Sequence, residues 1–191
     1  MGSYDGGVTP ERMFERQVQK GHVLRELVQE LGLVAGDQFL DVGSGPGYAS
    51  LLAAESVGPT GTVWALDVAP SALAYLQSRA QGTPFLNTVA ADAADFALPS
   101  EGVRRFLLTD VLHAAGDPHA IIRHLSRVLP TGARGVVCDY VPVDQKKFGP
   151  DPRKRIPPER VQAWLEDEGF ATLRQWNPPD EHYAFLVELR R

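Results

Sequence analysis

Four aspartates stand at equivalent places in the sequence, each at or just after the end of a short hydrophobic segment that predicts a strand. They are Asp41, Asp67, Asp92 and Asp110. Because the carboxyl ends of parallel strands meet at one edge of a sheet, we expect these four carboxylates to surround a single cleft. Carboxylates accept hydrogen bonds from hydroxyl and amino groups, and several together attract a cation. The pattern therefore predicts a site for a polar ligand that carries positive charge.

A glycine-rich loop follows the first of these aspartates and precedes a predicted helix. Its residues are Gly43, Ser44, Gly45, Pro46 and Gly47. Glycines permit positive φ angles and let a ligand approach the backbone, while the first amides of the next helix point towards that ligand. A dinucleotide fingerprint would need glycine at position 48, where the chain has Tyr48. A pyrophosphate is disfavoured too, because each carboxylate about 6 Å away would cost roughly 3 kcal/mol at an effective dielectric constant of about 20.

The elements that must hold these residues alternate between strand and helix along the chain. Strands are predicted over residues 38–42, 62–67, 85–90, 104–110, 133–140, 171–176 and 183–189. Helices are predicted over residues 10–31, 48–56, 70–81, 118–128 and 158–168. Strands that alternate with helices of this length indicate right-handed crossovers and a parallel sheet covered on both faces.

The last two predicted strands break this alternation. Only residues 177–182 separate them, which is too short for a crossover helix, so they should pair as an antiparallel hairpin. The sequence therefore predicts an α/β fold, a Rossmann-like doubly wound seven-stranded sheet that is parallel except for one antiparallel strand in a C-terminal hairpin. We expect residues 1–35 to form an N-terminal helical extension that packs on the core as a lid, and residues 36–191 to form the ligand-binding domain.

The composition is that of an ordinary globular protein. The 191 residues are 43% hydrophobic and 23% charged, which excludes a disordered or fibrous chain. The net charge of −5 argues against a surface that binds nucleic acid over its whole extent. Cys138 is the single cysteine, so we expect neither a disulfide framework nor a thiolate metal site, and we predict no metal.

The expected location of the protein follows from two features that the sequence lacks. No apolar run approaches the ~18 residues that a membrane span requires. The N-terminal residues form neither the cationic region nor the apolar region of a signal peptide. We therefore expect a cytoplasmic protein without a membrane span. Separately, we expect it to be a monomer or a homodimer.

A basic segment over residues 145–160 contrasts with the acidic chain. It holds six basic residues against two acidic ones, Asp151 and Glu159. The basic residues are Lys146, Lys147, Arg153, Lys154, Arg155 and Arg160. The segment is either a solvated loop or the rim of a site that attracts an anionic substrate.

Several short motifs occur in a fixed order from about residue 36 to the C-terminus. They are DVGSGPG at 41–47, Asp67, AD at 91–92, TDVLH at 109–113 and LPTGAR at 129–134. Their order and spacing resemble the signature of class I S-adenosylmethionine-dependent methyltransferases, over about four-fifths of the chain. The stretches VLHAAGDP at 111–118 and RIPPER at 155–160 are most similar to a small-molecule branch that includes the quinone-biosynthesis C-methyltransferases.

The resemblance implies a cofactor, S-adenosylmethionine, and the residues that bind it. Asp41 would face the methionyl ammonium, Asp67 would accept hydrogen bonds from both ribose hydroxyls, and Asp92 would accept one from the adenine amino group. The loop backbone would make room for the methionyl group, and Asp110 would lie near its end. The implied cofactor-binding residues are Asp41, Gly43, Ser44, Gly45, Gly47, Asp67, Val68, Asp92, Ala93 and Asp110.

The resemblance also implies the reaction, in which a methyl group passes from the sulfonium to a small-molecule acceptor by in-line displacement. A general base is needed only where the acceptor is a hydroxyl, a phenol or a carbon acid. The candidates that should face the cleft are His113, Asp139 and Tyr140. We predict His113 and Tyr140 as the catalytic residues, with His113 as the better base.

The sequence departs from related families at informative places. Amine methylases carry an Asn-Pro-Pro-aromatic element after the fourth strand, where this chain has TDVL at 109–112, and the NPPD at 177–180 reads as a turn. Quinone-type members often carry two histidines where this chain has His113 followed by Ala114. Arsenic methylation needs several thiols, which the single cysteine excludes.

Other functions stay open beside small-molecule methylation. One is a catalytically silent module that binds the cofactor and a protein partner. A second is methylation of RNA or protein through the basic segment, although a nucleic-acid partner is not what the charge favours. The least favoured is an NAD-dependent oxidoreductase on a similar sheet.

Overall fold

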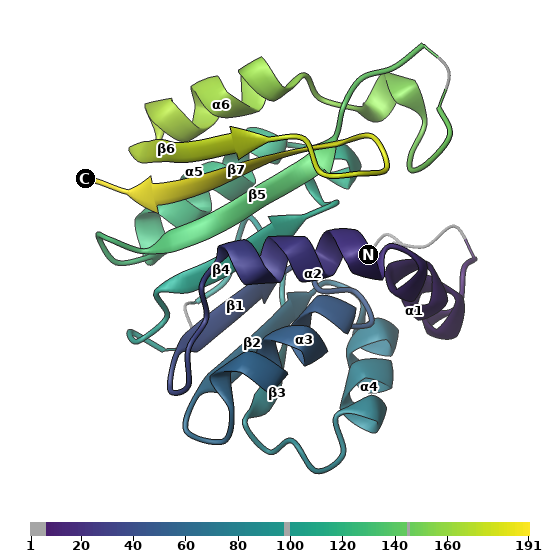
Figure 1. Ribbon diagram of the computed structural model, residues 1–191, viewed down its shortest axis with the longest axis vertical. Helices are drawn as coiled ribbons and strands as arrows, with labels where there is room; N and C mark the ends of the chain where they lie inside the picture. Colours follow the sequence, from purple (N-terminus) through teal and green to yellow (C-terminus); the bar gives the residue numbers. More distant parts are fainter. Residues whose placement is uncertain (1–6, 98–99, 145) are drawn as a thin grey trace.

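A single seven-stranded sheet forms the centre of the computed structural model, which describes residues 7–97, 100–144 and 146–191 (Figure 1). The strands are β1 Gln38–Val42, β2 Thr62–Asp67, β3 Leu86–Ala90, β4 Arg105–Thr109, β5 Arg134–Tyr140, β6 Phe170–Trp176 and β7 His182–Leu189. Their order is β3-β2-β1-β4-β5-β7-β6. Strand β7 runs antiparallel to both neighbours, whereas the other pairs are parallel. The predicted fold class is confirmed.

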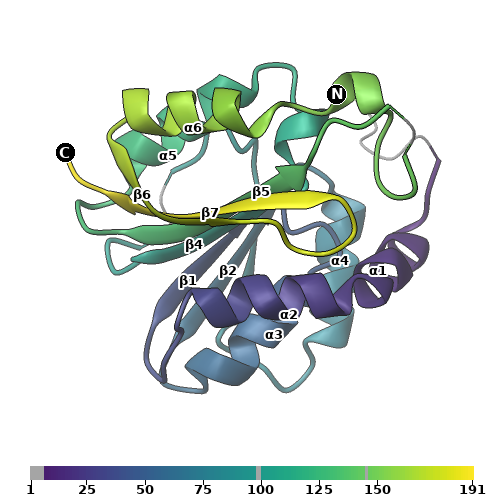
Figure 2. The ribbon, with the colours of Figure 1, turned by 45° about the horizontal axis from the view of Figure 1, so that its top comes forward.

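Helices cover both faces of the sheet, with α2 and α3 on one face and α5 and α6 on the other (Figure 2). The helices are α1 Pro10–Gln19, α2 Gly21–Glu30, α3 Tyr48–Val57, α4 Pro70–Arg79, α5 Pro118–Val128 and α6 Pro158–Asp167. Two short 3-10 helices are η1 Leu112–Ala114 and η2 Pro152–Lys154. In the described part of the chain, no helix is long and apolar enough to cross a membrane.

The N-terminal helix predicted over residues 10–31 is two helices instead. The backbone leaves the helical conformation at Lys20, with φ −89° and ψ 14°, and helix α2 starts at Gly21. Gly21 packs against the ring of Tyr48, where an added Cβ would lie only 3.0 Å from the tyrosine hydroxyl. The glycine therefore lets α2 approach the start of α3 closely, and the break places Lys20 beside the carboxyl edge of the sheet.

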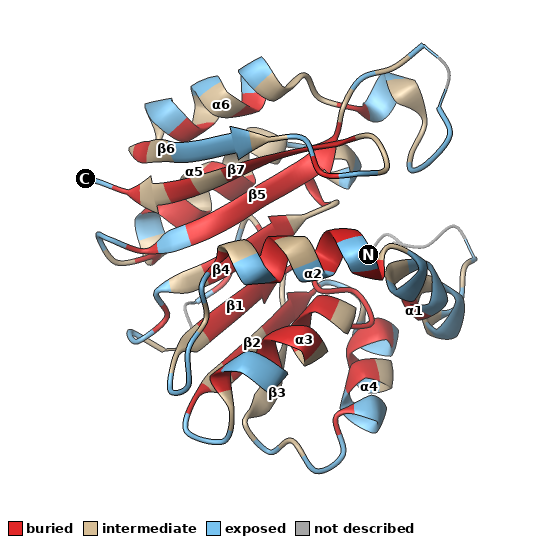
Figure 3. Cartoon of the chain, viewed as in Figure 1, coloured by how far each residue is buried: buried red, intermediate tan, exposed pale blue. Residues whose placement is uncertain are grey.

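Alternate residues of the strands pack into two hydrophobic layers, one on each face of the sheet, because neighbouring side chains of a strand point to opposite faces. On β1, Phe39 packs into the layer under α2 and α3, and Leu40 packs into the layer under α5 and α6. Buried residues accordingly follow the central strands and the inward faces of the helices (Figure 3). The last four residues of β1, residues 39–42, are buried between the two layers, which fixes the position of the loop that follows.

The order of the strands reverses at β1. This strand pairs with β2 on one side and with β4 on the other, both in parallel. In an open α/β sheet, such a reversal leaves a crevice outside the carboxyl ends of the two strands. The ends of β1 and β4, residues 42 and 109, are therefore where a ligand site is expected.

Gly135 offers a test of the packing between β4 and β5. It lies opposite Phe106, and an added Cβ would be 2.2 Å from the ring. We expect Gly135→Ala to lower the free energy of unfolding by about 1–3 kcal/mol, since overpacking a filled core costs that much. Chemical denaturation measures the change. Gly116→Ala is the matched control, because an added Cβ there meets nothing within 4 Å and should change stability by less than about 0.5 kcal/mol.

Candidate active site

Two adjoining cavities lie at the carboxyl ends of the central strands, and Gly43 lines both. The first has a volume of about 390 Å³ and the second of about 640 Å³. Predicted cofactor residues in the first cavity are Gly43, Asp67, Val68, Asp92 and Ala93. Those in the second are Asp41, Gly43, Ser44, Gly45 and Asp110, together with the predicted catalytic residues His113 and Tyr140. Gly47 lines neither cavity.

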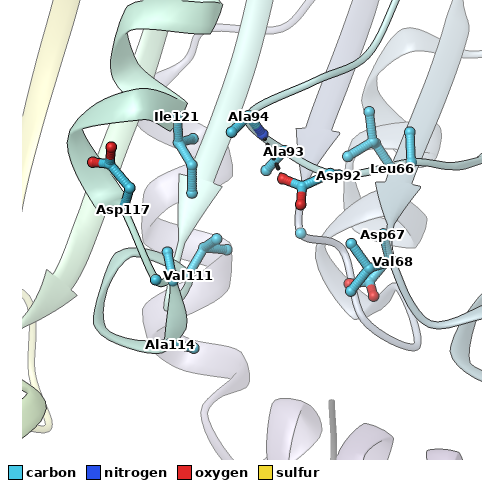
Figure 4. A pocket seen from close by; sticks show the side chains of 14 residues that line it. Leu66, Asp67, Val68, Asp92, Ala93, Ala94, Val111, Ala114, Asp117 and Ile121 are labelled. Carbon is cyan, nitrogen blue, oxygen red and sulfur yellow. Dashed lines mark hydrogen bonds between the residues drawn. The ribbon is translucent and has the colours of Figure 1, made fainter. Parts of the chain in front are cut away.

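The first cavity is a mostly apolar slot, with Asp67 and Asp92 on one side and Asp117, the N-cap of α5, on the other (Figure 4). Figure 4 shows Val111 and Ile121 across the cavity from Asp67, with Asp92 beside it. Asp92 Oδ1 accepts a hydrogen bond from the backbone N–H of Ala94 at 2.8 Å, which leaves its other oxygen for a ligand. Such a slot fits a flat apolar ring that carries donors on its edge.

Asp67, at the end of β2, ties the glycine-rich loop to the sheet. Its Oδ2 accepts from the N–H of Gly45 at 2.7 Å, and its Oδ1 accepts from the N–H of Ala69 at 2.9 Å. Burial raises the pKa of Asp67 despite these hydrogen bonds. Each carboxylate oxygen has a further lone pair, so the group can also accept from two hydroxyls of a ligand.

The glycine-rich loop can follow this path only because it lacks side chains at two crowded positions. Gly43 has a φ of 73°, and an added Cβ would lie 2.3 Å from Val111. Gly47 has a φ of 84°, and an added Cβ would lie 2.4 Å from Leu76. The loop is therefore pressed between the segment after β4 and helix α4. Its glycines are needed for backbone conformation and for space.

Asp41 lies under the loop and is nearly inaccessible, with 1% of its surface exposed. Its Oδ2 accepts a hydrogen bond from the hydroxyl of Ser50 at 2.6 Å. Burial raises the pKa of Asp41 to about 7, and the charge of Asp67 adds to the effect while the Ser50 hydrogen bond opposes it. A cation bound near Asp41 would favour its ionised form.

The second cavity contains a network of buried charges around Asp110. This residue has a positive φ of 58°, which is uncommon outside glycine. Its carboxylate pairs with the ammonium of Lys20 and, at 3.1 Å, with His182 Nε2. Burial alone would raise the pKa of Asp110, but Lys20 and His182 together lower it below its usual value. Asp110 therefore has protein partners already, and only a part of it is left for a ligand.

Tyr140 is fixed at the end of β5 beside this network. Its hydroxyl accepts a hydrogen bond from Lys20 Nζ at 2.9 Å, and its ring lies 5.0 Å from the guanidinium of Arg155 and 4.2 Å from the ring of His182. Burial raises the pKa of Tyr140 to about 12, with Asp110 adding to the effect and Lys20 opposing it. The phenol is therefore neutral at physiological pH, and it can donate a hydrogen bond but is a poor base.

His113 lies in η1, directly after β4, and pairs with Asp139 of β5. The Nδ1 atom of the ring is 2.8 Å from Asp139 Oδ1, and the backbone N–H of His113 donates to Asp139 Oδ2 at 3.1 Å. Asp139 is completely buried. The two residues that the sequence offered as separate candidates therefore form one unit.

The basic segment is less available to a ligand than its composition indicates. Arg155 is buried and binds Glu181 at 2.8 Å and the carbonyl of Val141 at 2.9 Å, so it holds the segment in place. Arg153 pairs with Asp151 at 2.6 Å. Of the six basic residues, Lys146 lines the second cavity, so the interpretation as a rim applies to this residue alone.

Several site residues escaped sequence reasoning because their partners are distant in the chain. Gln17 of α1 donates to the carbonyl of Ser44 at 3.0 Å and accepts from the N–H of Tyr48 at 3.0 Å, which clamps both ends of the loop. Lys20 and His182 lie 90 and 72 residues from Asp110. A polar residue on the inward side of a helix was the available signal for Gln17, and no local pattern marks the other two.

Comparison with known proteins shows the family to which this chain belongs. Residues 33–178 match the family model described as "Methyltransferase domain". An arsenite methyltransferase of Halobacterium salinarum is 24% identical over 82% of this chain and 42% of its own length. A demethylmenaquinone methyltransferase of Tropheryma whipplei is 29% identical over 64% of this chain and 50% of its own length. The chain thus spans about half the length of these curated relatives.

Solved structures agree on the fold. A SAM-dependent methyltransferase from Aquifex aeolicus has a TM-score of 0.83 and 21% identity, covering 95% of this chain and 99% of its own. The [4+2]-cyclase SpnF has a TM-score of 0.74 and 19% identity, covering 87% of this chain and 79% of its own. The chain belongs to the methyltransferase domain family, that of the class I S-adenosylmethionine-dependent methyltransferases that its motifs resemble.

Asp67 provides the first test of the cofactor site. We expect Asp67→Ala to weaken S-adenosylmethionine binding at least about tenfold, because losing one charge-assisted hydrogen bond costs about 1.5–3 kcal/mol. Isothermal titration calorimetry measures the Kd. Asp167→Ala removes an exposed carboxylate at the end of α6 and should leave the Kd unchanged. Equal affinity of the Asp67 variant and the wild type would contradict this placement of the ribose.

Asp41 predicts a pH dependence of binding. With a pKa of about 7, its carboxyl is ionised above that pH and protonated below it, so the attraction for a cation is lost as the pH falls. We take the ratio of the wild-type Kd to the Kd of Asp41→Asn at each pH. This ratio should be about tenfold higher at pH 6 than at pH 8. The variant is the control because the ligand's own titration affects both proteins equally. A ratio of the two Kd values that does not change with pH would rule out this role for Asp41.

Proposed function

We propose that this chain transfers a methyl group from S-adenosylmethionine, bound across both cavities, to a small molecule in the second cavity. The observation that carries the proposal is the junction of the cavities at Gly43. A carboxylate-bearing slot on one side of that glycine suits a nucleoside, and a larger space on the other side suits an acceptor. Three expectations remain predictions: the cytoplasmic location, the lid formed by residues 1–35, and the monomeric or dimeric state. Residues 1–6 of that lid lie outside the described part of the chain.

The residues present fit the cofactor. Asp67 would hold the ribose, Asp92 the adenine amino group and Asp41 the methionyl ammonium, with Val111 and Ile121 against the adenine ring. The fit rests on the free acceptors of the first cavity and on Gly43, which lines both cavities and where an added Cβ would lie 2.3 Å from Val111. When bound, the cofactor supplies a methyl group already activated by the positive charge on sulfur.

The contribution of the chain to such a reaction is placement of the acceptor. Displacement in line requires the reacting atoms about 3–3.5 Å apart, aligned and shielded from water. The second cavity is walled by α1, through Met13 and Gln17, and by residues 146–150, through Phe148 and Pro150. These two walls lie outside the sheet, so they can select the acceptor without altering the cofactor site.

The alternatives are weaker for specific reasons. The acidic first cavity and Tyr48 disfavour NAD. The basic segment has most of its charges paired or away from the cavities, which disfavours RNA or protein as the acceptor. A catalytically silent module that binds the cofactor and a protein partner is the second candidate. A similar fold occurs in a [4+2]-cyclase, so the fold by itself does not require methyl transfer.

Calorimetric titration with S-adenosylmethionine, S-adenosylhomocysteine and NAD tests the proposal. We expect binding of the first two in the micromolar range and none of NAD. Methyl transfer from the labelled cofactor to a panel of small acceptors should follow. Binding of NAD alone would mean that the acidic cleft is misinterpreted, and tight cofactor binding without transfer to any acceptor class would favour the silent module.

A further inference from the structure

The His113–Asp139 pair has the geometry of an oriented base. Three hydrogen bonds fix the Asp139 carboxylate, two from His113 and one from the N–H of Tyr140 to Oδ1 at 2.7 Å. Because Asp139 has no exposed surface, it cannot rotate towards solvent to find other partners. The carboxylate is therefore a fixed acceptor aimed at the ring of His113.

This acceptor decides which nitrogen of His113 carries the proton. An ionised carboxylate can only accept, so His113 Nδ1 must donate. In the neutral ring the lone pair then lies on Nε2. Within the described residues, Nε2 has no hydrogen-bond partner, and the side chain is 14% exposed where it lines the second cavity. An unpaired nitrogen base thus faces the space proposed for the acceptor.

The other titratable groups of the second cavity are engaged elsewhere. Lys20 binds Asp110 and Tyr140, Asp110 binds Lys20 and His182, and Asp41 accepts from a serine hydroxyl. The ring of His113 also meets the edge of Tyr140, with 5.7 Å between ring centres. The charged residues that line this cavity with His113 are Arg16, Lys20, Asp41, Asp110 and Lys146. Arg16, Lys20 and Lys146 are cations without a lone pair, and the two carboxylates already accept hydrogen bonds from groups of the protein.

We propose that His113 is the general base of this site, oriented by Asp139, and that the acceptor is a small molecule with an ionisable hydroxyl, a phenol or an enol. The inference rests on the proposed function. The hydroxyl proton passes to His113 Nε2, and the electron pair released on the acceptor forms the bond to the methyl carbon. The carbon–sulfur bond breaks with its pair kept on sulfur, and the imidazolium later gives its proton to water.

The surroundings favour a hydroxyl over an amine. A neutral amine attacks with its own lone pair and needs no base beforehand, so a fixed base facing the cavity would serve it little. Tyr140, which is neutral, can donate a hydrogen bond to the ionised oxygen, and the cation of Lys20 lies beside it. The side chains of Met13 and Phe148 offer apolar surface to a carbon skeleton.

The tautomer of His113 can be measured without any acceptor. Proton–nitrogen NMR of the histidine rings should show a neutral His113 with its proton on Nδ1, and Asp139→Asn should move that proton to Nε2. His119→Asn, which changes a histidine stacked on Trp164 away from both cavities, should leave the His113 signals in place. A wild-type ring protonated on Nε2, or an imidazolium throughout the range pH 6–9, would overturn the proposal.

The second test measures methyl transfer from S-adenosylmethionine, with matched phenols and anilines as acceptors. We expect the wild type to transfer the methyl group to the phenols, with a rate that falls at acid pH as the base is protonated. We expect His113→Asn to lower kcat about 10²–10⁴-fold and to lose that pH dependence. The Kd for S-adenosylmethionine should stay within twofold, and His119→Asn should match the wild type. Transfer only to anilines, or to no phenol by protein that binds the cofactor, would refute the acceptor class. Failure to bind the cofactor would instead contradict the proposed function.

Discussion

The tight connection between β1 and α3 is the constraint on which the rest of the site depends. Its glycines let the chain turn sharply enough for Gly43 and Ser44 to donate to the carbonyl of Leu66 at 2.8 and 2.9 Å. The same turn brings the N–H of Gly45 to Asp67, so the ends of β1 and β2 are joined by backbone and side chain alike. A side chain at Gly43 would clash with Val111 in the segment after β4, because an added Cβ would lie 2.3 Å from it. The geometry of the proposed cofactor site is thus set mainly by the backbone conformation of this loop.

This arrangement buries several carboxylates, which is unfavourable for their ionised forms. The structure compensates for this in two ways. Asp41 and Asp67 repel each other and depend on hydrogen bonds from Ser50, Gly45 and Ala69, so a bound cation would relieve the site. Asp110 has its own cation instead, since Lys20 reaches it from the break between α1 and α2. The junction between the two helices is therefore the place from which Asp110 receives its positive partner.

The sequence was sufficient for features that local pattern encodes. Alternating strands and helices, the glycine loop and the aspartates at strand ends each follow from residues that are close in the chain, and the sheet brings them together by topology. The break at Lys20 was not predicted, because the hydrophobic face continues through it, and the close contact of Gly21 with Tyr48 joins segments that are distant in the chain. The partners of Asp110 and the buried role of Arg155 were missed for the same reason, since both depend on contacts between distant segments.

The two walls of the second cavity come from opposite ends of the chain, and both are attached to it by polar contacts. Gln17 fastens α1 to the glycine loop, and Arg155 fastens residues 146–150 to β5 and to Glu181. Each wall can therefore change its apolar side chains, such as Met13 or Phe148, while its attachment and the sheet stay the same. A fold built in this way can keep one cofactor site and accept different small molecules, with the acceptor selected by His113 and the cavity walls.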